Sequence, residues 1–206
     1  MAHYYFFLCT LLTLSLSFYG TSAVNYQVTN FAEKTPGGIR FTKEIGIPFT
    51  KTLMGTINNY IWTTILQQSD PADRKPVPTV NIYIVDFKGA EAITWGDNIN
   101  GKAPTGLVEG VADYTILKAN YFPPAFAKPG TGNKWDQGYD FTARFLEYCD
   151  GITPGFVAKL NKKMRKTFDV KFFQELTGKP LDTLWKNYKA KYGNIKHGDD
   201  ITEFVN

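Results

Sequence analysis

The chain carries Gly106-Leu107-Val108-Glu109-Gly110-Val111-Ala112-Asp113-Tyr114 near its middle, and the interpretation of the remaining sequence starts from this stretch. Its apolar residues recur at helical spacing, so it predicts a helix. On that helix two carboxylates, Glu109 and Asp113, lie four residues apart, an arrangement that zinc hydrolases use. Such enzymes also need a histidine pair, whereas this chain has two histidines in all, His3 and His197, neither near Glu109 in the sequence. The stretch therefore indicates a metallohydrolase helix without its histidine partners.

Residues 1–23 have the features of a secretory signal peptide. An uncharged apolar core at 6–18 precedes the small residues Thr21, Ser22 and Ala23 of a cleavage site. The alternative is an uncleaved anchor, which the length disfavours because a membrane span needs ~20 apolar residues. We expect a secreted, extracellular protein with no membrane span.

The chain that remains after cleavage is mildly basic and keeps a single cysteine. All 23 Lys and Arg and all 19 Asp and Glu follow residue 23, so the formal charge of +4 is retained. This charge favours contact with an acidic cell-wall or membrane surface. The basic residues are interleaved with acidic ones, which argues against nucleic-acid binding. Cys9 leaves with the signal, so we expect Cys149 to be buried in a monomer, with intermolecular pairing as the alternative.

Periodicity divides the rest of the chain into a short sheet and a series of helices. Alternating residues predict strands at 24–29 and 80–85, and a long amphipathic helix is expected at 49–68. Further helices are expected at 107–117, 141–148, 155–164, 172–176 and 181–192. The predicted fold class is α+β, a small mixed sheet followed by helices, in one domain at 24–193 with a polar tail at 194–206. His197 lies in this tail, and we expect it to be exposed.

Residues 135–140, Trp-Asp-Gln-Gly-Tyr-Asp, concentrate aromatic and polar groups in a predicted loop. An aromatic surface of this kind can stack on sugars or hold a peptide. The alternative is that Trp135 and Tyr139 only cap the core. By residue type alone Tyr139 is also a candidate to stabilise an oxyanion, although no spacing supports that role.

Many blocks of the sequence resemble the plant basic secretory protein family, a group of secreted proteins regarded as zinc peptidases. The blocks occur in order over most of the chain after residue 23: 28–30, 35–38, 40–41, 71–75, 106–114, 128–130, 135–140, 142–146, 160–165 and 184–185. The resemblance implies a zincin-like fold, an apoplastic location and a link to plant defence.

The resemblance also implies a helix with an HExxH motif between the strand at 80–85 and residues 106–114. Two histidines of that motif bind zinc, and the glutamate between them activates water. Here the interval contains only residues 87–104, so a block of the family's sequence is missing. If Glu91 corresponds to the catalytic glutamate, the two ligand positions hold Ala90 and Thr94, which cannot replace imidazole.

We therefore expect a shortened zincin-like domain with no intact metal site and no cofactor, whereas the intact family uses zinc. By resemblance Glu109 corresponds to the third zinc ligand and Asp113 to an orienting group. Both are interpreted as vestigial, as are the catalytic candidates Glu91 and Tyr139. A solvated acidic face is the alternative origin of the pair, because like charges at this spacing cost a helix only roughly 0.2–0.5 kcal/mol. Loss of the zinc helix also predicts a poorly packed region beside the helix at 107–117.

The leading functional hypothesis is a secreted, metallopeptidase-like pseudoenzyme with a defence-related binding role toward peptides or cell-wall glycans. Whether the chain is an enzyme stays open, with the missing histidines arguing against it. One alternative is an active zinc-dependent endopeptidase in which Glu91 acts as base and Glu109 or Asp113 holds a metal. The other is an incomplete gene model of an intact enzyme, in which the missing block reflects a lost exon.

Overall fold

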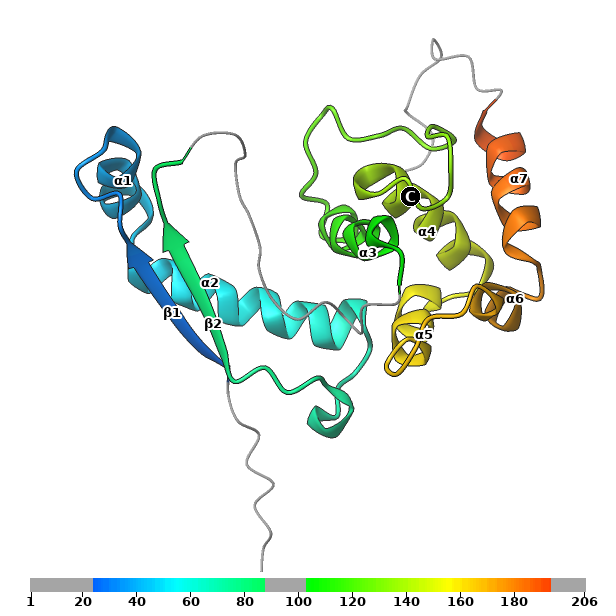
Figure 1. Ribbon diagram of the computed structural model, residues 1–206, viewed down its shortest axis with the longest axis horizontal. Coiled ribbons are helices and arrows are strands. Elements are labelled where there is room, and N and C mark those ends of the chain that lie inside the picture. Colours follow the sequence, from blue (N-terminus) through cyan, green and yellow to red (C-terminus); the bar gives the residue numbers. More distant parts are fainter. Residues whose placement is uncertain (1–23, 88–102, 194–206) are drawn as a thin grey trace, which may run out of the picture.

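The computed structural model describes residues 24–87 and 103–193, which form an α+β fold as the sequence predicts. The strands are β1 (Asn25–Asn30) and β2 (Thr79–Ile84). The helices are α1 (Pro36–Arg40), α2 (Ile47–Tyr60), α3 (Thr105–Lys118), α4 (Tyr139–Ile152), α5 (Phe156–Lys163), α6 (Lys171–Thr177) and α7 (Leu181–Tyr192). Short π-helical segments at Phe41–Ile45 and Ile61–Ile65 extend α1 and α2, and a 3-10 turn covers Pro71–Asp73. In Figure 1 the strands and α1 lie at one end of the molecule and α3 to α7 at the other, and α2 runs from the sheet toward the helices.

The described sheet consists of β1 and β2, which pair in parallel. Tyr26 lies opposite Val80, and Val28 lies opposite Ile82. Because paired residues of parallel strands point to the same side, these four side chains share one face of the sheet. On that face the ring of Tyr26 approaches Gly55 of α2. Helix α2 therefore covers one face of the two-stranded sheet (Figure 1).

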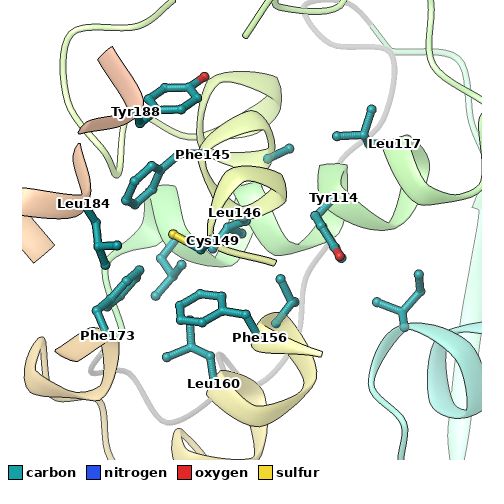
Figure 2. Close-up of a cluster of buried hydrophobic side chains, with 14 of the residues drawn as sticks. Tyr114, Leu117, Phe145, Leu146, Cys149, Phe156, Leu160, Phe173, Leu184 and Tyr188 are labelled. Carbon is teal, nitrogen blue, oxygen red and sulfur yellow. The ribbon is translucent and has the colours of Figure 1, made fainter. Parts of the chain in front are cut away.

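The main hydrophobic core lies among α3 to α7 rather than under the sheet (Figure 2). Phe145 of α4 is fully buried, and its ring centroid lies 6.2, 5.3 and 5.6 Å from those of Phe173, Trp185 and Tyr188. Aromatic pairs of this kind add ~0.5–1.5 kcal/mol beyond the burial of their area. From the N-terminal part of the chain, residues 65 and 66 just after α2 join this core.

Helices α3 and α4 form the most extensive helix contact of the described chain, and glycine makes it possible. A Cβ atom on Gly110 would lie 2.3 Å from Cγ2 of Thr142 in α4. Four residues earlier, a Cβ atom on Gly106 would lie 1.9 Å from the carbonyl oxygen of Asp136. Residues four apart share one face of a helix. One face of α3 is thus bare enough for α4 and the preceding loop to approach its backbone.

The loop before α4 is fastened to the helix by buried hydrogen bonds. The hydroxyl of Thr142 accepts a hydrogen bond from the Gly138 N–H (2.9 Å) and donates one to the Trp135 carbonyl (3.0 Å). The carboxylate of Asp140 accepts a hydrogen bond from the N–H of Ala127 (2.7 Å). These hydrogen bonds therefore hold residues 135–138 against the start of α4.

The helices expected from periodicity after residue 106 are all present, and the one expected at 181–192 matches α7 at both ends. The helix expected at 49–68 corresponds to α2 with its π-helical extension. The poor packing expected beside the helix at 107–117 is not found among the described residues, since Leu107, Tyr114 and Leu117 are buried in the core.

Exposed apolar side chains lie instead along α2. Phe49, Leu53 and Ile57 belong to the apolar pattern of the amphipathic helix expected at 49–68, and they are 58%, 42% and 39% exposed. The reason is that the sheet contacts another face of the helix, the one that carries Gly55.

Cys149 lies in α4 and is fully buried, as the sequence predicts. Burial raises the pKa of its thiol, and the nearby charge of Asp150 raises it further. A protonated thiol inside the core is inert toward disulfide exchange. Intermolecular pairing through Cys149 would require this part of the core to open.

Replacing Gly110 with alanine tests the contact between α3 and α4. Helix propensity alone favours alanine by about 1 kcal/mol. The added methyl group would overlap Thr142, whose hydroxyl is held by two hydrogen bonds. Because overpacking of this kind costs ~1–3 kcal/mol, we expect Gly110→Ala to lower the free energy of unfolding measured in urea.

The matched control is Gly151→Ala in α4, where a Cβ atom would meet nothing within 4 Å. This change should be neutral or stabilising because only propensity acts. Equal stability of the Gly110→Ala and Gly151→Ala chains would contradict the close contact of α3 with α4.

Candidate functional site

The two carboxylates of the sequence motif lie on α3 at the edge of its contact with α4. The side chains of Glu109 and Asp113 are half-buried. Leu107 and Tyr114, which flank them, are buried in the core. One helix therefore positions the pair as the sequence predicts, with apolar neighbours holding that helix in place.

A third carboxylate joins them from α4. Burial raises the pKa of the Asp113 carboxyl, and the negative charges of Asp140 and Glu109 raise it further. Asp140 lies in the first turn of α4. None of the three forms an ion pair with a residue that the structure describes. We call Glu109, Asp113 and Asp140 the acidic group.

Tyr114, the last residue of the motif, belongs to the core and not to the site. It is 3% exposed. The pKa of its hydroxyl is raised, mainly by burial and also by the charge of Asp150, with which it forms a hydrogen bond. Tyr114 thus links α3 to Asp150 of α4 and is not part of the acidic group.

The two aromatic residues of the loop at 135–140 lie in different surroundings. Trp135 packs against Phe168 and Phe173, with ring centroids 6.4 and 5.4 Å apart, so it caps the core. Tyr139 begins α4 with a positive φ of 48° and is 61% exposed. Its neighbour in sequence is Asp140 of the acidic group. The loop therefore presents one exposed ring, that of Tyr139, rather than a pair of exposed rings.

The other sequence candidates lie outside the described residues. This applies to Glu91 with its neighbours Ala90 and Thr94, and also to His3 and His197. Within residues 24–87 and 103–193 no group of three or more His, Cys, Asp or Glu side chains has a metal-binding arrangement.

The donors present in the described chain do not fit a catalytic zinc. Such a site takes three protein ligands, usually with imidazole nitrogen among them, and leaves one position for water. The acidic group offers carboxylate oxygen alone, and no imidazole lies among the residues that the structure describes. What the group can do is accept hydrogen bonds from hydroxyl or amine groups of a ligand.

Sequence reasoning missed the residues that build this surface. Gly106, Gly110 and Thr142 bring α3 and α4 together, and only because of that contact does Asp140 lie near Asp113. The signal available in the sequence was the spacing of the two glycines at four residues on one helix face.

Comparison with known proteins gives two matches. A sequence model of the family BSP, described as a peptidase of plants and bacteria, matches residues 21–99 and 92–188. The match consists of two segments that meet at 92–99, not of one continuous stretch. The chain is also similar to a basic secretory protease from Boswellia serrata, with 42% identity over 60 residues that cover 29% of this chain and 69% of that protein. No solved structure matches the chain.

Every helix within the described ranges is too short or too polar to cross a bilayer.

The raised pKa of Asp113 predicts how stability depends on pH. In the folded chain this carboxyl keeps its proton to higher pH than in the unfolded chain. The free energy of unfolding therefore falls as the pH rises from the ordinary pKa of an aspartate through the raised pKa of Asp113. Asp113→Asn removes the charge. We expect the variant to be more stable than the parent at pH 7 by roughly 0.2–0.5 kcal/mol, the cost of one like-charge pair on a helix. The difference should vanish in acid, below the ordinary pKa of an aspartate.

Thermal unfolding measured between acid and neutral pH checks this prediction. The control is Asp182→Asn in the first turn of α7, where a carboxylate is stabilised by the helix N-terminus. That variant should lose stability at pH 7. Loss of stability at pH 7 in the Asp113→Asn chain would contradict the assignment of Asp113 to a repulsive acidic group.

Proposed function

Because the chain belongs to the basic secretory protein family of plant and bacterial peptidases, we propose that it is a secreted member that has lost zinc peptidase activity and retains a binding role. The observation that carries this proposal is a contrast within the sequence. The Glu109–Asp113 pair is intact on α3, yet no histidine occurs between His3 and His197.

Without imidazole ligands the chain lacks the means to make a zinc-bound hydroxide. A catalytic zinc lowers the pKa of its bound water to about 7, and that water is the nucleophile in peptide hydrolysis. The positions that flank Glu91 hold Ala90 and Thr94, neither of which is a zinc ligand. Loss of the metal therefore removes the nucleophile along with the Lewis acid.

The binding surface we assign consists of the exposed ring of Tyr139 and the acidic group beside it. The ring can stack on the apolar face of a sugar or on a peptide side chain. The carboxylates can accept hydrogen bonds from sugar hydroxyls or from the amines of a basic peptide. Peptides and cell-wall glycans are the ligand classes that this combination fits. The formal charge of +4 would keep the secreted protein near acidic cell-wall polymers, which suits a role in defence.

The alternative is an active zinc-dependent endopeptidase. One observation favours the version of this alternative in which the sequence comes from an incomplete gene model of an intact enzyme. The two segments of the family match meet at 92–99, inside the interval 87–104 where the HExxH block is missing from the sequence. An exon absent from the gene model would produce this pattern. Sequencing the transcript across the codons for 87–104 distinguishes a real loss from an incomplete gene model.

Zinc uptake and peptide cleavage by the purified chain test the loss of activity. We expect no stoichiometric zinc after dialysis, measured by elemental analysis, and no cleavage of casein above a heat-inactivated control. The matched variant is Glu109→Gln. Metal-dependent cleavage that Glu109→Gln abolishes would overturn the proposal in favour of an unconventional site with Glu91 as base and Glu109 or Asp113 on the metal.

Binding is tested by screening the chain against soluble cell-wall oligosaccharides and a peptide library, followed by titration of the best ligand. Tyr139→Ala should weaken binding of that ligand by about 1 kcal/mol, or roughly fivefold in Kd, because one stacking ring is removed. The control is Tyr121→Ala, since Tyr121 is 86% exposed and lies outside the assigned surface. An equal effect of both changes, or none from Tyr139→Ala, would place the binding site elsewhere.

A further inference from the structure

Helix α2 presents a row of apolar side chains that no described element covers. Phe49, Leu53 and Ile57 follow one another at four-residue spacing, so they form a single stripe along the helix. They are 58%, 42% and 39% exposed. Gly55, on a different face of the helix, is the residue that approaches the sheet at Tyr26. We call Phe49, Leu53 and Ile57 the α2 stripe.

Lys51 is the one charged residue within α2. From Thr52 to Ser69 the chain has no Lys, Arg, Asp or Glu. A helix that faces water on its outer side normally carries charged residues there. The composition of α2 is instead typical of a helix covered on both sides.

The polar groups that border the α2 stripe are satisfied within the helix. The hydroxyls of Thr50, Thr52 and Thr56 donate hydrogen bonds to carbonyls four residues earlier, at 2.8, 3.1 and 3.1 Å. Burying a hydroxyl is costly mainly when its donor is left unpaired. These donors keep their partners when water leaves, so this face of α2 can be dehydrated at low cost.

We propose that the α2 stripe is the interface of a homodimer in which two copies of α2 pack antiparallel about a two-fold axis at Leu53. A two-fold interface needs a surface that is complementary to itself. The spacing of the stripe is symmetric about Leu53, so Phe49 of one protomer meets the partner's Ile57 and the reverse contact repeats it. Packing along rows of residues four apart is the commonest geometry of helix pairs.

The lack of charge favours a second copy over a lipid surface as the occupant. A helix that lies on a membrane carries Lys and Arg along its polar face, and α2 has none after Lys51. The same neutrality means that two chains of formal charge +4 bring no charged side chains of α2 into the middle of the interface. A monomer is the expectation from the sequence, and the uncovered face of α2 is the reason to depart from it.

Sedimentation velocity of the purified chain from residue 24 to residue 206, without the predicted signal peptide, over about a hundredfold range of concentration tests the dimer. We expect a species of twice the monomer mass whose population rises with concentration. Leu53→Asp should weaken dimerisation at least about tenfold, because it places two carboxylates at the two-fold axis. The control is Ile116→Asp on α3, a residue of similar exposure (40%) outside the stripe, which should dimerise like the parent. Circular dichroism of both variants confirms that each is folded.

A cross-linking experiment tests the geometry. Leu53→Cys should form a covalent dimer under oxidation, while Ile116→Cys should not. The native thiol of Cys149 does not compete because it is buried. A chain that stays monomeric throughout the range, or a dimer that Leu53→Asp leaves intact, overturns the proposal. So does a monomer that binds phosphatidylglycerol vesicles through Leu53, since the occupant would then be lipid.

Discussion

The close approach of α3 to α4 at Gly106 and Gly110 is the contact on which the described structure depends. A side chain at Gly110 would overlap Thr142, and one at Gly106 would overlap the backbone at Asp136. With both positions bare, α3 can bury Leu107 and Tyr114 in the core beside α4. The same contact brings Asp113 near Asp140 at the start of α4. The helical core and the acidic group are thus two results of one steric condition.

The glycines and the tyrosine of the 106–114 motif have packing roles that require no metal. Its glycines set the distance between helices, and its tyrosine fills the core. Glu109 and Asp113 are carried on the same turns, and their mutual repulsion is small compared with the packing that holds them. Family membership explains why the motif is present. Its packing role explains how the motif fits a chain that has no HExxH sequence.

The N-terminal part is covered less completely than the helical part. Parallel strands are usually protected on both faces, whereas α2 covers one face of β1 and β2 and leaves Tyr83 and Phe31 exposed near the strand ends, with ring centroids 5.7 Å apart. The α2 stripe is uncovered as well. Both surfaces belong to the part of the chain that precedes the interval where the family match breaks. Both surfaces thus lie in the part of the chain that the first matched segment, 21–99, covers.

The sequence by itself determined the local features of this protein. Periodicity located the helices from α3 to α7, and residue spacing placed Glu109 and Asp113 on one helix, because both depend on neighbours within a few positions along the chain. Only the tertiary structure decided that Trp135 packs against the core while Tyr139 is exposed, that Asp140 lies near Asp113, and that Leu53 is partly exposed. Those outcomes depend on contacts between segments that are distant in the sequence. An amphipathic pattern indicates that one face of a helix is apolar, but it does not indicate which segment covers that face.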